Sequence, residues 1–148
     1  MDEGRIEKAT RRARLVLSDG REVHGDVFVG LYEPHHVGPQ RVGELLNEQE
    51  AFIPVKTDEG VLLVNRTRVI SVTLPADREQ DDLVTLGKRY EVRVTTTHGE
   101  LKGAIFINLP ETSARVRDYF NQPLPFLALF QSQTVAYLNR DFIVLVQD

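Results

Sequence analysis

Charged and amide side chains recur in a fixed pattern at two places in this chain, and such groups can bind an anion or a carboxylate of a partner. Arg41 stands three residues before Glu44, and Arg66 follows Asn65 further along the chain. Residues spaced i, i+3 on a helix can face each other, so Arg41 and Glu44 could form an ion pair. The rigid fork of arginine suits bidentate contacts with a carboxylate or another anion. The pattern therefore permits either an ion-pair network that fixes a helix to a sheet or a site for an anionic ligand.

The same pattern returns 74 residues later, because the stretch 41–72 aligns with 115–146 without a gap. Glu44 meets Asp118 in this alignment, and eight further pairs are identical. The identical pairs are Arg41/Arg115, Val42/Val116, Asn47/Asn121, Phe52/Phe126, Val61/Val135, Asn65/Asn139, Arg66/Arg140 and Val72/Val146. The arginines at 41, 66, 115 and 140 are the candidates for binding a ligand or partner. The matched acids and asparagines are expected to be structural: Glu44, Asp118, Asn47, Asn121, Asn65 and Asn139.

No group of residues indicates catalysis, a metal or a cofactor. The chain has no cysteine, which excludes disulfides, thiol catalysis and Cys-ligated zinc. It contains neither a G-x-S-x-G elbow nor a Gly-rich phosphate loop. The adjacent His35 and His36 lie in a loop rich in glycine and proline, without further ligands at metal spacing in the sequence. We therefore expect no metal site and no cofactor, and the sequence favours a protein that is not an enzyme.

The composition is that of an ordinary soluble protein, with 41% hydrophobic and 27% charged residues. No apolar run reaches about 18 residues, so no transmembrane helix is expected. The polar N-terminus lacks the apolar core of a secretory signal, which predicts a cytoplasmic location. The net charge of −4 argues against general binding to nucleic acid or to an anionic membrane.

Two glycine turns predict two β-hairpins. Alternating apolar residues flank Asp19-Gly20, and this dipeptide favours a type I′ turn. Gly25 interrupts the inward-facing side of the second strand, which predicts a bulge or a close approach of another backbone. In the second copy, Gly99 matches Gly20 and Gly103 matches Gly25. These four glycines are therefore predicted to be structural.

A short helix and three strands follow each hairpin. Apolar residues at i, i+3 and i+4 within 41–48 predict the first helix, and Asn47 is expected to end it in a left-handed conformation. Pro54 cannot donate to a ladder, so its strand is expected at an edge or a bulge. Thr112 or Ser113 could cap the second helix.

These elements predict a mainly β (α+β) protein made of two tandem ββαβββ units of the small-barrel type. Unit 1 is expected at 13–74, a linker at 75–89 and unit 2 at 90–148, after a loosely docked lead-in at 1–12. Two copies suggest packing about a pseudo-two-fold axis, as in a homodimer joined into one chain. The first half of the linker is expected to be acidic and solvated because of four residues: Asp77, Glu79, Asp81 and Asp82.

An uninterrupted apolar run distinguishes the second unit. Phe126, Leu127, Leu129 and Phe130 surround one alanine, whereas the corresponding stretch of the first unit contains a proline and a lysine. A continuous apolar run predicts a strand buried on both faces. It would be either a central strand covered by the other unit, which we favour, or an edge that accepts a partner strand. These four residues join the arginines as candidates for partner binding.

The pattern R-x-x-[ED]-x-[LF]-N, then F-[LI], then [VL]-N-R-x-x-[VI], resembles a group of small bacterial domains of unknown function. The likeness covers nearly all of each unit and implies a bacterial source without an activity. The hairpin LVLSDGREVHGDVFV and the later LLVNRTRVISV also resemble the strand pattern of Sm-like and SH3-like small barrels. That resemblance implies a possible role in nucleic-acid binding.

Three functions are open from the sequence. The favoured one is a non-enzymatic module that binds another protein or forms a homo-oligomer. The second is an Sm-like nucleic-acid binder, supported by arginines in and before the first hairpin: Arg5, Arg11, Arg12, Arg14 and Arg21. The third is a sensor of a small anionic ligand, which the paired arginines would hold in the crevice between the units.

Overall fold

The computed structural model describes residues 8–80, 86–108, 110 and 115–148, which form one antiparallel sheet of ten strands. The mainly β prediction is thus confirmed. The first half contributes β1 (Lys8–Leu17), β2 (Glu22–Gly30), β3 (Phe52–Thr57), β4 (Gly60–Asn65) and β5 (Val69–Pro75). The second half contributes β6 (Lys88–Thr96), β7 (Gly99–Ile107), β8 (Phe126–Phe130), β9 (Thr134–Asn139) and β10 (Ile143–Gln147).

The helices are short and lie between the strands. Among the described residues, an α-helix follows the second strand of each half: α1 (Val42–Leu46) and α3 (Val116–Phe120). The 3-10 turns are η1 (Arg66–Arg68), η2 (Ala76–Arg78) and η4 (Arg140–Phe142). Within the described ranges, the structure has no helix with the length and apolar character that a membrane span requires.

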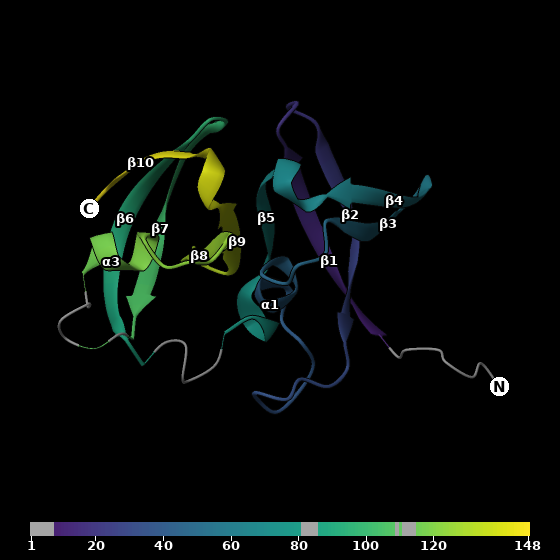
Figure 1. The fold of residues 1–148 in the computed structure, drawn as a ribbon, viewed down its shortest axis with the longest axis horizontal. Coiled ribbons are helices and arrows are strands. Elements are labelled where there is room, and N and C mark those ends of the chain that lie inside the picture. Colours follow the sequence, from purple (N-terminus) through teal and green to yellow (C-terminus); the bar gives the residue numbers. More distant parts are fainter. Residues whose placement is uncertain (1–7, 81–85, 109, 111–114) are drawn as a thin grey trace.

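Both halves place their strands in the same lateral order and meet in the middle of the sheet. The first half runs β5-β1-β2-β3-β4 and the second runs β10-β6-β7-β8-β9. The halves join where β5 pairs with β9, with Val72 opposite Tyr137 (Figure 1). A two-fold axis would bring the same strand of each half together. The expected pseudo-two-fold relation therefore does not describe the junction, which joins the fifth strand of one half to the fourth of the other, head to tail.

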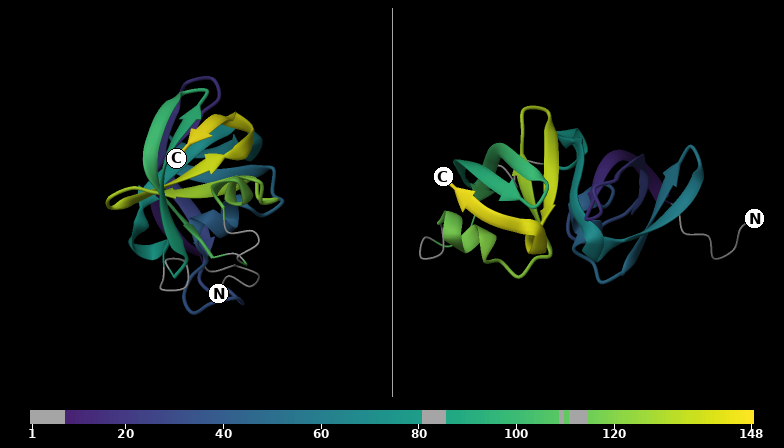
Figure 2. Two further views of the ribbon diagram at one scale, coloured as in Figure 1. Left: turned by 90° about the vertical axis from the view of Figure 1, so that its left-hand side faces the viewer. Right: turned by 90° about the horizontal axis from the view of Figure 1, so that it is seen from above.

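Each half curves around its own hydrophobic cluster, and Figure 2 shows the two curved groups of strands side by side. Leu15, Val27 and Val55 belong to the cluster of the first half. That cluster also contains Phe126 and Tyr137, which come from the second half. The two cores are therefore continuous with the junction, and burial at the junction is part of the stability of both halves.

The first hairpin forms where predicted, but its turn differs. The loop spans residues 18–21, with Gly20 in the left-handed region at φ 90°. Asp19 has a negative φ, so the type I′ prediction is wrong, since that turn needs positive φ at both central residues. The predicted close approach is confirmed: a Cβ on Gly25 would lie 2.5 Å from the carbonyl oxygen of Lys56, and one on Gly103 would lie 2.6 Å from that of Phe130.

Several boundaries and local conformations differ from expectation. Strand β1 already begins at Lys8, so part of the expected lead-in belongs to the sheet. Pro54 is in β3, which lies between β2 and β4 and is not an edge. The β2 ladder reaches only Val55 and Lys56, so proline is tolerated beyond its end. Asn47 does end α1, but with φ −95° instead of a left-handed conformation.

The second half confirms the central position of the apolar strand. Strand β8 pairs with β9 along its whole length and with β7 at Phe130, opposite Ala104, so it lies between two strands of the sheet. Leu127 and Leu129 are buried in the core of the second half. Arg115 takes the N-cap position of α3, and the predicted caps Thr112 and Ser113 lie outside the described residues.

Candidate functional site

A pocket of about 510 Å³ opens where the two halves meet. Its walls are mostly apolar and come mainly from the second half, with aromatic rings that include Phe106, Tyr119 and Phe130. Polar groups reach it from the first half, through Arg41 in front of α1 and Glu79 after η2. A mostly apolar cavity with a few convergent polar groups is the usual form of a small-molecule site.

Glu79 is a buried carboxylate at this junction, with only 2% of its surface exposed. The hydroxyl of Tyr137 donates to its Oε1 at 2.6 Å, and the backbone N–H groups of Val42 and Gly43 donate to its two oxygens at 3.0 and 3.2 Å. Burial raises the pKa of Glu79 despite these hydrogen bonds. The prediction of a solvated linker is therefore wrong at Glu79, which ties the start of α1 to β9. Asp77 is exposed as expected, and residues 81–82 lie outside the described ranges.

Gly43 makes the contact between α1 and β9 possible. A Cβ at this position would lie 2.5 Å from the ring of Tyr137. Tyr137 is buried, and desolvation raises the pKa of its hydroxyl. The ring therefore stays a neutral donor to Glu79 and packs against bare backbone.

The four candidate arginines do not converge on the pocket. Arg66 donates through Nη1 to the carbonyl of Leu46 at 2.9 Å, and Arg140 donates in the same way to the carbonyl of Gln122. Each thus satisfies backbone carbonyls around the end of the preceding α-helix, where carbonyls otherwise lack partners. These two arginines hold the helix to the following strand through backbone contacts instead of through the expected carboxylates.

The arginines in front of the helices differ between the halves. Arg115 forms an ion pair with Asp118 at 2.8 Å on the exposed surface, as the i, i+3 spacing predicts. This pairing lowers the pKa of Asp118. Of the four candidate arginines, Arg41 is the one that lines the pocket. Phe126, Leu127 and Phe130 also line it, whereas Leu129 does not.

Two of the four matched asparagines connect the halves. The side chain of Asn47 accepts from the backbone N–H of Phe126 at 2.9 Å and donates to the carbonyl of the same residue at 3.2 Å. Asn139 donates to the carbonyl of Val69 at 2.9 Å. Their counterparts bond locally: Asn121 donates to Arg117, and Asn65 accepts from Thr67. At the junction, two of the matched asparagines therefore bond the backbone of the other half. The other two bond residues close to them in the sequence.

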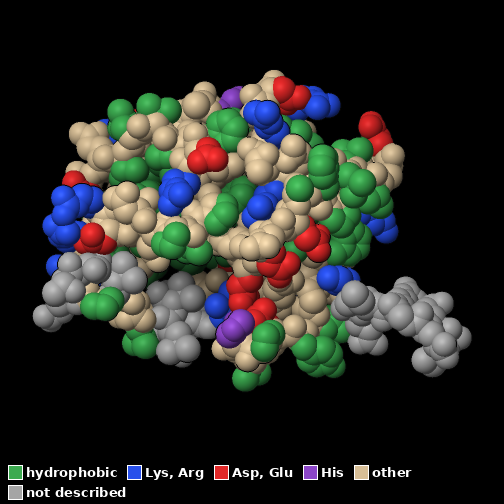
Figure 3. All heavy atoms as spheres, viewed as in Figure 1, with side chains coloured by type: hydrophobic (Ala, Val, Ile, Leu, Met, Phe, Trp, Pro, Cys, Tyr) green, Lys and Arg blue, Asp and Glu red, His purple; other side chains and the backbone are tan. Residues whose placement is uncertain are grey.

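The two outer strands of the sheet expose apolar side chains. In β4, Val61 is 59% and Leu63 is 68% exposed, and in β10 Leu145 is 52% exposed. Figure 3 shows hydrophobic side chains gathered on the side where β3 and β4 lie. Natural edge strands are usually protected by charge, proline or a cover. Neither β4 nor β10 contains a charged residue or a proline.

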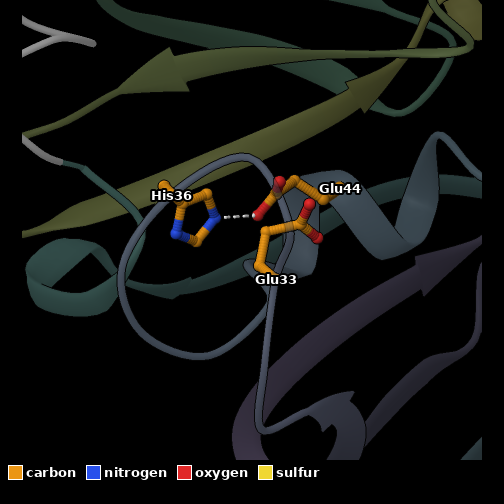
Figure 4. A group of neighbouring side chains, drawn as sticks. All are labelled: Glu33, His36 and Glu44. Carbon is orange, nitrogen blue, oxygen red and sulfur yellow. Dashed lines mark hydrogen bonds and ion pairs between the residues drawn. The ribbon is translucent and has the colours of Figure 1, made fainter.

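A second polar cluster lies between the loop after β2 and helix α1. One ligand-type atom from each of Glu33, His36 and Glu44 lies within 4.8 Å of the others (Figure 4). The Nε2 atom of His36 is 2.7 Å from an oxygen of Glu44, and this contact raises the pKa of His36. Glu33 is held by His35, which lowers the pKa of the Glu33 carboxyl.

The basic residues of the first hairpin do not form a free cationic face. Three of the five arginines have acidic neighbours on the same hairpin, with pairs Arg12–Asp26, Arg14–Glu22 and Arg21–Asp19. Arg5 lies outside the described residues. Local acids thus offset much of the positive charge on which the nucleic-acid hypothesis depended.

Comparison of the chain with protein-family models, curated proteins and solved structures finds no match.

Sequence reasoning missed the roles of Glu79 and His36. No pattern marks Glu79, because its three donors come from residues 36 to 58 positions away. His36 had a weak signal in its loop, but the carboxylates that meet it became apparent only in three dimensions. One signal in the sequence was available: Gly43 of the first helix aligns with Arg117 of the second. A glycine in only one of two similar helices indicates that another group approaches that helix closely in the first half.

Proposed function

We propose that this protein is a non-enzymatic scaffold module, a tandem duplication that joins head to tail with further copies of itself. The observation that carries the proposal is the strand pairing at the junction. Inside the chain, the fifth strand of one half pairs with the fourth strand of the other. The strands left free are the fourth of the first half, β4, and the fifth of the second half, β10. The chain thus carries both sides of its own internal contact at its two ends.

The alignment of the halves gives the register of the external contact. At the junction Ser71 pairs with Leu138, and Val72 pairs with Tyr137. Subtracting or adding the repeat of 74 residues transfers these pairs to Leu145 with Val64, and Val146 with Leu63. The exposed apolar side chains of both edges would then be buried, as their equivalents at the junction are. Because the contact joins unlike surfaces, the assembly is a closed ring or an open filament, depending on the rotation between copies.

The bridging asparagines support the same contact. Transferred by the repeat, Asn121 of one copy would bond the backbone of Phe52 in the next, as Asn47 bonds Phe126. Asn65 of that next copy would bond the carbonyl of Ile143, as Asn139 bonds Val69. In the single chain Phe52 is 54% exposed, whereas Phe126 is 2% exposed.

Native mass spectrometry of the purified chain over a range of concentrations tests the proposal. We expect multiples of the monomer mass that are lost in the double variant Val61→Lys/Leu63→Lys, because two buried lysines would oppose strand pairing. Val37→Lys is the matched control, since Val37 is fully exposed in a loop away from both edges. A chain that stays monomeric at all concentrations, or an assembly that survives the double variant, would overturn the proposal.

Disulfide cross-linking tests the register separately, because the chain has no cysteine of its own. A mixture of Leu63→Cys and Val146→Cys chains should form a mixed disulfide dimer under mild oxidation, since directly paired residues meet the distance a disulfide needs. Leu63→Cys mixed with Val144→Cys is the control, two residues out of register. Equal cross-linking in both mixtures would contradict the proposed pairing.

A second candidate function is the sensing of a small anionic ligand in the crevice between the halves. The pocket of about 510 Å³, with Arg41 on its wall, is the observation in its favour. A thermal-shift screen of small carboxylates and phosphates should find a stabilising ligand, and Arg41→Gln should remove its effect. Arg115→Gln is the matched control, because Arg115 holds the same place in the second half. A shift that persists in Arg41→Gln would argue against this site.

A further inference from the structure

The cluster of Glu33, His36 and Glu44 joins two separate segments of the first half. Glu33 and His36 stand in the loop after β2, and Glu44 stands in α1. The side chains of Glu33 and His36 are mostly buried, and that of Glu44 is 30% exposed. Figure 4 shows the imidazole of His36 facing the carboxylate of Glu44, with the carboxylate of Glu33 beside that of Glu44. Two carboxylates and one imidazole in this arrangement are a set of metal-ligand types.

Each of the three side chains is oriented by a partner outside the cluster. In the metal-free chain the Nε2–H of His36 donates to Glu44, and the Nδ1 atom lies 3.1 Å from the carbonyl oxygen of Val37. With Nδ1–H held by this carbonyl, loss of the Nε2 proton leaves a lone pair that faces the carboxylates. The backbone N–H of Arg41 donates to Glu44 at 2.8 Å, and the backbone N–H of His35 donates to Glu33 at 3.2 Å. Metal-binding histidines and carboxylates in proteins are typically held by such outer contacts.

The distances fit a small divalent cation after a minor adjustment. Ligand atoms around zinc or a similar ion stand about 2.0 to 2.2 Å from the metal, which places tetrahedral ligands about 3.4 to 3.6 Å from each other. The three atoms lie within 4.8 Å of one another, and those of His36 and Glu44 are 2.7 Å apart, so side-chain shifts of about 1 Å bring them to this spacing. Glutamate side chains have the rotational freedom for this movement, and solvent reaches the site past Glu44.

We propose that Glu33, His36 and Glu44 form a binding site for a divalent transition-metal ion such as Zn²⁺ or Mn²⁺. The imidazole favours these ions over Ca²⁺ and Mg²⁺, which prefer oxygen ligands alone. Binding releases the Nε2 proton of His36 to water and replaces the hydrogen bond between His36 and Glu44 with bonds from both groups to the ion. The ion then links the loop after β2 to α1. The site is separate from the two sheet edges, so it stands whether or not the chain assembles, although Glu44 also lines the pocket between the halves.

Isothermal titration of the chelator-treated full chain with Zn²⁺ tests the proposal. We expect one ion per chain, and an affinity at least about 10-fold weaker in His36→Gln and in Glu33→Gln. His24→Gln is the matched control, because His24 is an exposed histidine 3.7 Å from a single carboxylate, that of Glu22. Bound Zn²⁺ should also raise the melting temperature of the wild-type chain and of His24→Gln.

Circular dichroism without metal shows whether each variant is folded, and Glu33→Gln serves if His36→Gln is not. No Zn²⁺ binding by the folded wild-type chain at 100 µM would overturn the proposal. Binding that persists unchanged in His36→Gln and Glu33→Gln would also overturn it. Equal weakening in His24→Gln would place the ion on surface histidines, and likewise overturn the site.

Discussion

The inner junction and the two outer edges of this sheet are made from corresponding strands, yet they differ in what covers them. Val135 of β9 is fully buried against β5, whereas Val61, the aligned residue of β4, is 59% exposed. Ile70 and Ser71 of β5 are buried, while the aligned Val144 and Leu145 of β10 are exposed. The sequence of a strand thus sets its apolar character, but its neighbour decides whether that character stabilises the fold or remains available for a partner.

The largest difference between the two regions is expected at the paired phenylalanines. Phe126→Ala should lower the free energy of unfolding by about 3 to 5 kcal/mol, because it leaves a cavity in the core. Phe52→Ala should cost well under about 2 kcal/mol in a monomeric chain, since half of that side chain is in water. Urea denaturation at low protein concentration measures both. Similar losses in the two variants would mean that the junction and the edge are not distinct.

A smaller difference is expected at the paired asparagines. Asn47→Ala removes both hydrogen bonds to Phe126 and should cost about 1 to 3 kcal/mol, because a buried backbone N–H loses its partner. Asn121→Ala removes a contact within its own exposed turn and should cost less than about 1 kcal/mol. The same denaturation experiment compares them, and a costlier Asn121→Ala would reverse the assignment of the bridging role.

The smallest effect concerns pH and the buried carboxylate at the junction. Burial raises the pKa of Glu79 in the folded state above its ordinary value of 4.5. Folding therefore favours the neutral form of Glu79. The contribution of this protonated group to the free energy of unfolding is complete below about pH 4.5 and is lost as pH rises through the pKa of the folded state. Glu79→Gln should flatten the part of the stability curve that lies above pH 4.5. Asp77→Asn, an exposed acid in the same turn, is the control.

If the slope of stability against pH is the same in Glu79→Gln as in the wild type, burial of the Glu79 carboxylate does not contribute to the pH dependence, and the prediction is wrong. If Asp77→Asn flattens the curve as strongly, the effect belongs to the charge of the turn and not to the junction.

Alternation of apolar residues and the glycine turns sufficed to predict the hairpins, the short helices and the strands after them. The close approach at Gly25 followed from the missing side chain. The position of Pro54 was mispredicted, because the sequence does not show where a neighbouring ladder stops. The burial of Glu79 was also mispredicted, because an acid among acids appears solvated unless its distant donors are known.

The arrangement of the halves was beyond sequence reasoning for a different reason. Repetition of a pattern predicts similar units, but a symmetric and a head-to-tail contact can use the same residues. Whether the contact is symmetric or head-to-tail depends on which strands lie at the edges of each half, and that is a property of the whole sheet. The candidate arginines illustrate the same limit, because Arg66 and Arg140 meet backbone carbonyls that no side-chain pattern encodes.

The contact of Gly43 with the ring of Tyr137 affects which strands could pair in the proposed assembly. The aligned position in α3 is Arg117, and the position in β4 aligned with Tyr137 is Leu63. A strand that carries tyrosine at this place fits beside glycine and is obstructed beside a long side chain. In the proposed assembly, strand β9 therefore cannot replace β4 next to β10. First and second halves would alternate without error, and a growing assembly would add only whole chains in one orientation.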